Sequence, residues 1–168
     1  MVDSESFSKR LNRVVHTPGW VFMVLERMGA AWSRILSHAV GYPFRKLFFG
    51  EFHWSVTINP GCQFRQRKNI CFAPGVIVNR GVVLHAPVDR FLVIGEKTQV
   101  NPYAVIYGHV MIGRKVMISP HVMMAAGNHR FDRVDIPMMD QGNSFKGGIR
   151  IEDDVWIAAN CTITPGVR

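Results

Sequence analysis

Apolar side chains recur at every sixth residue from Ile58 to Met124, and this period limits what the chain can fold into. The positions are Ile58, Phe64, Ile70, Val76, Val82, Val88, Ile94, Val100, Ile106, Ile112, Ile118 and Met124. An α-helix repeats about every 3.6 residues and a β-strand about every 2, so neither requires a period of six. A parallel β-helix does, because each side of its coil is one short strand plus one corner. The period therefore predicts an all-β solenoid.

The remaining positions of each hexad agree with this prediction. The fourth residue after each apolar position is small or β-branched in the cleanest stretch, as expected for a second inward side chain: Thr98, Ala104, Val110, Val116 and Val122. Corner residues follow the apolar positions, as in Asn101-Pro102 and Ser119-Pro120. Lys68 and Arg80 fall at inward positions of the early hexads. We therefore expect an irregular first coil.

A long loop is expected to leave the coil over residues 125–150. The hexads resume at Ile151, Ile157 and Ile163, but the step from Met124 to Ile151 is 27 residues, which is not a multiple of six. The intervening residues must leave the coil, and a long loop on a regular scaffold is a usual place for a functional site. The expected organisation is thus a β-helix over residues 51–168 with one extruded loop.

Residues 1–50 differ in composition and are expected to form a helical cap. Thr17-Pro18 is typical of a helix start, and an apolar stripe at helical spacing follows: Val21, Leu25, Met28, Trp32, Ile35 and Ala39. Glu26, Arg27 and Arg34 within this amphipathic helix argue against a membrane span. The expected role is to cover the open end of the solenoid. The alternative is peripheral contact with the inner membrane face.

Charge and cysteine content narrow the compartment and the partners. The net charge of +8 favours an anionic partner, but no nucleic-acid-binding motif is present, so nucleic acid is not expected. Cys62, Cys71 and Cys161 lack the spacing of metal ligands and are expected to be small core residues in a reducing compartment. We therefore expect a cytoplasmic protein.

The loop and its flanks resemble the hexapeptide-repeat O-acetyltransferases of the sugar and polysaccharide type, such as the maltose, galactoside and colanic-acid acetyltransferases. The matching pieces are Asn-His-x-Phe at 128–131, Gln141-Gly142, Asp-Asp-Val-Trp-Ile-x-Ala-Asn at 153–160, and the upstream run at 100–109. Together they span about residues 92–168. The resemblance implies a left-handed β-helix, a homotrimer with active sites between subunits, acetyl-CoA as co-substrate, no metal, and a saccharide or lipid-linked sugar acceptor.

The resemblance also assigns catalytic roles to two residues. His129 matches the catalytic histidine, and a sugar hydroxyl needs such a base to attack a thioester directly, without an acyl-enzyme. Without the flanking motif, a loop histidine is more often simply solvated. Asn101 matches an asparagine that faces the same cleft, although Asn-Pro is also ordinary corner chemistry.

Further positions are expected to bind the two substrates. Trp156, Ala158, Ala159 and Asn160 match the wall that holds acetyl-CoA, although this chain has Ala158 where the family commonly has glycine. Tyr103, Phe131 and Gln141 are the expected acceptor contacts. Lys146, Arg150 and Arg168 are candidates for the coenzyme phosphates. The family normally continues past Pro165-Gly166-Val167, which leaves open how tightly a chain ending at Arg168 binds acetyl-CoA.

Two other functions stay open at this point. A zinc enzyme of the carbonic-anhydrase type could use His85, His109, His121 and His129, with ligands from adjacent subunits. A non-catalytic interaction module would also fit a basic solenoid. Within the enzyme class, transfer to an amino-sugar nitrogen is a close relative of transfer to a hydroxyl.

Overall fold

The structure is a computed structural model, and residues 45–168 are described here. The predicted N-terminal helical cap and its possible membrane contact fall almost entirely outside these residues. Within the described part, 45–48 form one helical turn. No helix among the described residues is long and apolar enough to cross a membrane.

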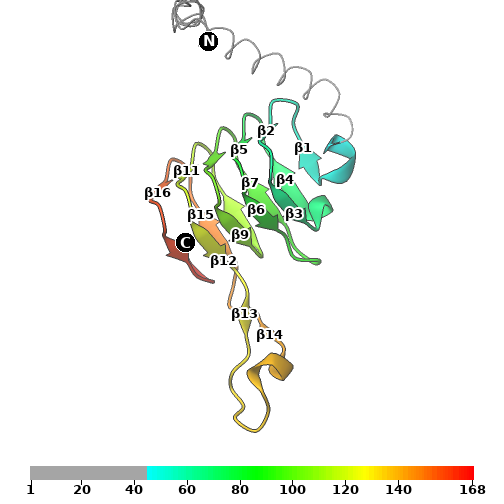
Figure 1. Cartoon of the computed structure of the whole chain (residues 1–168), viewed down its shortest axis with the longest axis vertical. Helices are drawn as coiled ribbons and strands as arrows, with labels where there is room; N and C mark the ends of the chain where they lie inside the picture. The colour runs from blue at the N-terminus through cyan, green and yellow to red at the C-terminus, as the bar shows by residue number, and fades with distance from the viewer. Residues whose placement is uncertain (1–44) are drawn as a thin grey trace, which may run out of the picture. The chain divides into compact units, whose positions relative to one another are not determined.

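Three parallel five-stranded sheets form the sides of the solenoid, and each sheet takes every third strand of the coil (Figure 1). The first sheet contains β1 (Glu51–Phe52), β4 (Ile70–Phe72), β7 (Leu92–Ile94), β10 (Val110–Ile112) and β15 (Ile149–Ile151). The second contains β2 (Thr57–Ile58), β5 (Ile77–Val78), β8 (Gln99–Val100), β11 (Met117–Ile118) and β16 (Trp156–Ile157). The third contains β3 (Gln63–Arg65), β6 (Val83–His85), β9 (Val105–Tyr107), β12 (Met123–Ala125) and β17 (Thr162–Ile163). The predicted parallel solenoid is confirmed.

Two inward residues from each side of the coil fill the core. Ile94, Ile106 and Ile118 are fully buried, and so are all five predicted second inward residues from Thr98 to Val122. Thr98 is the buried polar residue of the described core. Its hydroxyl donates to the Gly113 carbonyl at 2.8 Å and accepts from the Val116 amide at 3.0 Å. The buried hydroxyl of Thr98 therefore both donates and accepts a hydrogen bond, as buried polar groups usually do.

The single six-residue register predicted from the sequence is wrong between Ile70 and Val88. Phe52 pairs with Phe72 and Phe72 with Ile94, which are steps of 20 and 22 residues, whereas Ile94 pairs with Ile112 after 18. Two extra residues therefore precede β4 and four precede β7. Together they restore the period of six, so the break is hidden in the sequence.

Ile70, Val76 and Val82 are buried although the register assigned to them is wrong, because they occupy the second inward position. Ile70 pairs with Leu92, two residues before Ile94, and both side chains are fully buried. Val88 lies in the four-residue insertion and is 78% exposed, so its assignment to the core is wrong. The expected irregularity of the first coil is confirmed, and it extends into the second coil.

Among the coils of residues 51–168, variation in length is confined to one of the three corners. The connections from the first to the second sheet, and from the second to the third, contain four residues in every coil. The connections from the third sheet back to the first are residues 66–69, 86–91, 108–109 and 126–148. We call this the insertion corner. The connections joining the second and third sheets form the ladder corner, named for its stacked asparagines.

Candidate active site

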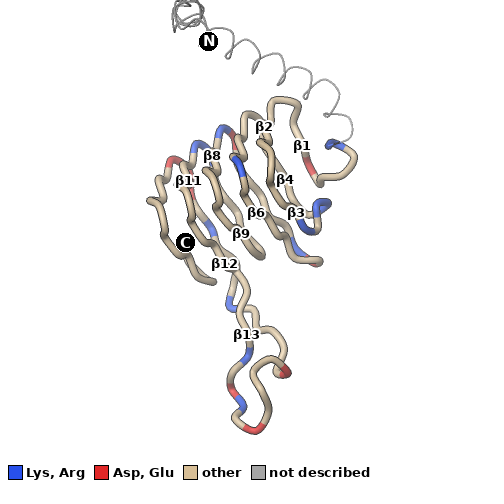
Figure 2. The backbone as a smooth tube through the Cα atoms, in the orientation of Figure 1, with Lys and Arg blue, Asp and Glu red and all other residues tan. Residues whose placement is uncertain are grey.

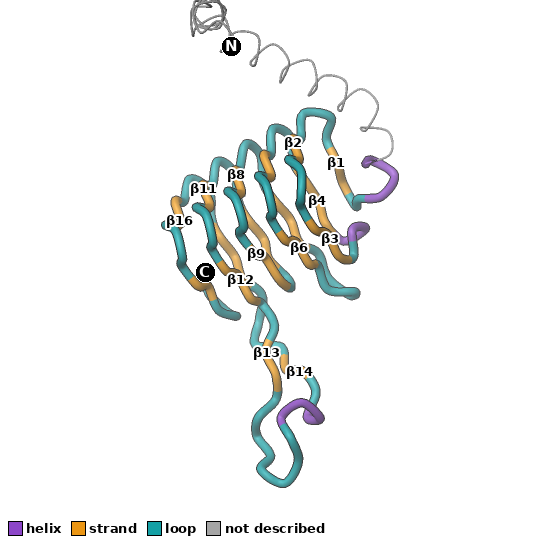
Figure 3. The backbone as a smooth tube through the Cα atoms, in the orientation of Figure 1, coloured by secondary structure: helices purple, strands orange, loops and turns teal. Residues whose placement is uncertain are grey.

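The longest insertion, residues 126–148, projects from the solenoid as the predicted extruded loop (Figures 1 and 3). Its two arms pair as an antiparallel ribbon, β13 (Asn128–His129) with β14 (Asn143–Ser144), and its tip contains the 3-10 helix η2 (Met138–Gln141). His129 lies opposite Asn143 in this pairing. We call residues 126–148 the hairpin.

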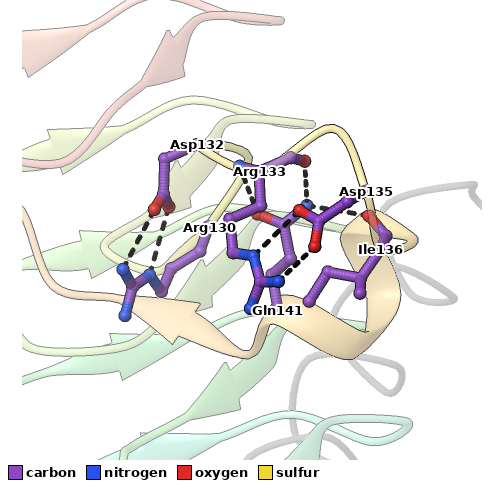
Figure 4. A network of polar contacts seen from close by, with 6 residues as sticks. All are labelled: Arg130, Asp132, Arg133, Asp135, Ile136 and Gln141. Carbon is purple, nitrogen blue, oxygen red and sulfur yellow. Dashed lines mark hydrogen bonds and ion pairs between the residues drawn. The ribbon is translucent and has the colours of Figure 1, made fainter.

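Polar contacts within the hairpin fix the shape of its tip (Figure 4). Arg130 pairs with Asp132 at 3.0 Å, and Arg133 pairs with Asp135. In both cases the neighbouring guanidinium holds the pKa of the aspartate below its usual value. The Gln141 side chain accepts a hydrogen bond at Oε1 from the Arg133 backbone N–H. Its Nε2 donates to the backbone carbonyls of Arg133 and Ile136. Gln141, an expected acceptor contact, is thus occupied in holding the loop together.

A cavity of about 500 Å³ lies where the hairpin joins the solenoid, and His129 lines it. Its walls come from Pro87, Asp89 and Arg90, from residues 107–109, and from both arms of the hairpin at 126–129 and 143–145. His129 is exposed, and its backbone amide donates to Asn128 Oδ1 at 2.9 Å. The hydrogen bonds of the described residues do not engage its imidazole, which is available to a ligand.

Asn101 lies at the ladder corner, away from the His129 cavity lining of the same chain. The Asn59 side chain donates to Asn79 Oδ1 at 2.9 Å, and the Asn79 side chain donates to Asn101 Oδ1 at 3.1 Å. In the next coil Ser119 takes the equivalent position, because the Asn101 backbone N–H donates to the Ile118 carbonyl oxygen at 2.9 Å. Asn101 therefore ends the asparagine ladder, and its side-chain Nδ2 has no hydrogen-bond partner within residues 45–168.

The expected cofactor residues lie next to this ladder. Trp156 is 70% exposed on β16, and its Nε1 donates to Ser119 Oγ at 3.0 Å. Ala158, Ala159 and Asn160 are exposed and continue the same corner in the last described coil. The structure thus brings together the residues expected to form the coenzyme wall and places Asn101 two coils from them.

Tyr103, an expected acceptor contact, has a clear structural role at the same corner. It takes a left-handed backbone conformation, with φ of 62°, and its ring stacks on His121 at 5.4 Å. Below it, a Cβ on Gly81 would come within 2.5 Å of the Tyr103 ring. Tyr103 therefore needs a glycine beneath it. Its side chain remains 49% exposed.

The predicted site residues thus form two groups on one chain. His129, Phe131 and Gln141 belong to the hairpin at the insertion corner. Asn101, Tyr103, Trp156, Ala158, Ala159 and Asn160 belong to the ladder corner. Phe131 is 59% exposed, with Lys146 Nζ 5.3 Å from its ring centre. The two groups sit at opposite ends of the third-sheet strands, so one chain does not assemble them into a single site.

The four histidines considered as zinc ligands are separated in the described chain. His85 contacts the Tyr107 ring edge to face, His109 bonds the Phe91 carbonyl, and His121 stacks on Tyr103. Burial, followed by the nearby Arg65 charge, lowers the pKa of His85. Among residues 45–168, no three His, Cys, Asp or Glu side chains come close enough together to hold a metal ion.

Basic residues are spread over the first coil, the corners and the hairpin rather than gathered in one place (Figure 2). Of the candidates for coenzyme phosphates, Arg150 and Arg168 both contact Glu152, at 3.0 and 2.9 Å. Arg168, and then Arg150, lower the pKa of the Glu152 carboxyl. Two of the three candidate cations are therefore already paired.

Sequence reasoning missed the other residues of the cavity, notably Arg90, His109 and Ser144. No signal in the sequence located the insertion at 86–91, because Val88 is apolar and keeps the six-residue period although its side chain is exposed. His109 was considered only as a metal ligand.

Comparison with known proteins agrees with the coil. Residues 92–126, the third and fourth coils, match the family described as bacterial transferase hexapeptide (six repeats). No curated protein sequence matches the chain. Among solved structures, AntD of Bacillus cereus, an N-acyltransferase in complex with dTDP and 3-hydroxybutyryl-CoA, is similar with a TM-score of 0.62 and 19% identity over 75% of this chain and 69% of that one.

A hexapeptide-repeat acetyltransferase of Vibrio cholerae is similar with a TM-score of 0.48 and 22% identity, covering 77% of this chain and 60% of that chain. The repeat match and the three-sided parallel coil confirm the predicted parallel β-helix, and both are consistent with its expected left hand. The third and fourth coils of this chain therefore match the hexapeptide repeat of bacterial transferases. The fold of the chain is similar to that of AntD.

Proposed function

We propose that this chain is an acyltransferase that moves an acetyl group from acetyl-CoA to a hydroxyl of a saccharide or lipid-linked sugar. The observation that carries the proposal is His129, held on a paired ribbon at the edge of a 500 Å³ cavity with its imidazole available. A hexapeptide-repeat coil supports that ribbon. The AntD structure contains a CoA ester, so a donor of this kind is compatible with the fold.

His129 is the general base in this proposal. The thioester supplies an activated acyl group. As the acceptor oxygen forms its bond to the acyl carbon, His129 takes the hydroxyl proton, and it returns that proton to the departing coenzyme sulfur. Transfer is direct, and no residue of the chain carries the acyl group.

The separation of the two residue groups supports a homotrimer as the working form. The hairpin of one subunit supplies His129, and the ladder corner of its neighbour supplies Trp156 and Asn101. The exposed Trp156 side chain and the backbone amides after Ile157 then hold the coenzyme, with one amide donating to the thioester oxygen. No metal takes part in this scheme.

The chemistry of the cysteines fits a cytoplasmic enzyme. Cys62, Cys71 and Cys161 are free thiols. The sequence predicted that they are core residues, but they are only half-buried. Burial raises the pKa of Cys62 and Cys71, which keeps these thiols protonated and unreactive. Peripheral membrane contact through residues 1–44 stays a prediction. It requires that the full chain sediment with anionic vesicles at low salt and that removing residues 1–42 abolish this.

The experiment that tests the function is acetyl transfer followed by mass spectrometry, with a panel of saccharides, amino sugars and sugar nucleotides. The parent chain is compared with His129→Ala, which should lower the rate by about 10²- to 10⁴-fold because general-base catalysis is lost. The hairpin is held by other residues, so circular dichroism and the trimer mass should not change. Equal rates in both proteins would refute the role of His129. No transfer by a folded parent trimer would favour the non-catalytic module.

A further inference from the structure

The cavity beside His129 is built by insertions that the regular coil lacks. Residues 86–91 form one wall and the two arms of the hairpin form the other, with the short connection 108–109 between them. The walls are tied together, since the Arg90 guanidinium lies 3.6 Å from the centre of the Phe145 ring. Asn69 also donates to the carbonyls of Pro87 and Val88, both at 2.8 Å. The cavity volume falls within the usual range for small-ligand sites.

His109 is held in one tautomer at the base of this cavity. Its Nδ1 lies 2.8 Å from the Phe91 carbonyl oxygen. A carbonyl can only accept a hydrogen bond, so Nδ1 carries the proton and Nε2 of the neutral ring is an acceptor. Nε2 has no hydrogen-bond partner within residues 45–168. Gly148 makes room for this ring, because a Cβ there would come within 2.6 Å of His109 Cδ2.

Ser144 presents a second unused polar group. Its Oγ is buried and has no hydrogen-bond partner, the one such side-chain atom among the described residues. Ser144 lines this cavity and also a smaller one, and His129 lines both. A buried hydroxyl without a partner is costly, and a bound polar ligand would remove that cost.

The rest of the lining suits a sugar ring. Tyr107 and Phe145 are half-exposed aromatic side chains that offer apolar surface, while Arg90 adds hydrogen-bond donors. Apolar walls with a few placed polar groups are typical of small-molecule sites. A ligand with several hydroxyls can donate to His109 Nε2, and a turn of the buried Ser144 side chain about χ1 toward the cavity would let Oγ pair with a second hydroxyl.

We propose that this cavity is an acceptor subsite contained within one chain, in which His109 Nε2 and Ser144 Oγ bind hydroxyls of a saccharide ring. His109 binds the acceptor in this scheme, whereas His129 takes the proton. The proposal rests on the proposed function, and it divides the two substrates between subunits: the acceptor lies at the insertion corner, and the coenzyme lies at the neighbour's ladder corner.

The test compares the full-length parent with His109→Asn, His109→Gln and Ser144→Ala. Asparagine keeps a donor for the Phe91 carbonyl but loses the acceptor at Nε2, whereas the longer glutamine places its amide near that position. His109→Asn should raise the acceptor KM about tenfold, the usual effect of one lost hydrogen bond, and leave the acetyl-CoA KM unchanged. Ser144→Ala should also raise the acceptor KM, and His109→Gln should recover part of the loss. His53→Asn in the first coil is the matched histidine control and should match the parent.

A binding measurement separates failure of this proposal from failure of the proposed function. Histidine ring signals in NMR spectra of the parent are followed during titration with methyl glucoside, methyl galactoside and glucuronic acid, without acetyl-CoA. Saturable shifts of the His109 signals that need a higher sugar concentration in Ser144→Ala support the subsite even where no transfer occurs. Parental acceptor KM values in both His109→Asn and Ser144→Ala would overturn it. If the parent shows no transfer, KM values cannot be compared. In that case, His109 signals that no sugar shifts would overturn the proposal.

Discussion

The ladder corner lies at the start of each third-sheet strand and the insertion corner at its end. The two corners differ in how much the length of their connections varies. Every connection at the ladder corner has four residues, and asparagine side chains in successive coils bond to one another across it. Connections at the insertion corner range from the two residues 108–109 to the hairpin at 126–148. Repetition favours ladders of identical contacts, and variation in length allows a cavity. The predicted coenzyme wall lies at the repetitive corner, and the proposed base and acceptor subsite lie at the variable one.

The largest effect should come from the core that both corners share. Ile94→Ala removes a fully buried side chain and should lower the free energy of unfolding by about 2–5 kcal/mol. Val88→Ala changes another position of the same sequence period, but this side chain is 78% exposed, so stability should stay within about 0.5 kcal/mol of the parent. Urea denaturation measures both. A similar loss in the two variants would contradict the insertion before β7.

A smaller effect is expected from breaking the asparagine ladder. Asn79 bonds both neighbours, whereas Asn59 bonds Asn79 through a single side-chain contact. Asn79→Ala should therefore cost about 1–3 kcal/mol of unfolding free energy, and Asn59→Ala about half as much. Chemical denaturation of the two variants gives the ratio. Equal losses would mean that the ladder bonds do not act as separate rungs.

The smallest effect concerns the pH dependence of stability at the insertion corner. Burial and Arg65 lower the pKa of His85 in the folded chain, so the unfolded chain binds the proton more tightly. Stability should therefore be complete above the ordinary histidine pKa of about 6.5 and fall as the pH drops through the lower folded value. His85→Gln should remove this slope while His53→Gln keeps it, as read from thermal unfolding at several pH values. An unchanged slope in His85→Gln would assign it to other groups.

The sequence predicted the coil because hexad spacing is a local property that any inward position must satisfy. It could not locate the breaks at 66–69 and 86–91, because the two insertions add up to one hexad and Ile70, Val76 and Val82 are inward in either register. The hairpin was predictable because its length does not fit the period. The position of His129 relative to Asn101 was not, since it depends on which corner each residue occupies and on how subunits associate.

The insertions of the described coils all lie at one corner, so this corner is the place where the solenoid accepts additional residues. After each insertion the next strand resumes its place, as β15 does beside β10 with Ile112 opposite Ile151. Connections as different in length as 108–109 and 126–148 therefore join the third sheet to the first while the described connections at the other two corners keep their four residues. New recognition loops could be installed at 66–69, the described connection there that lies outside the cavity lining.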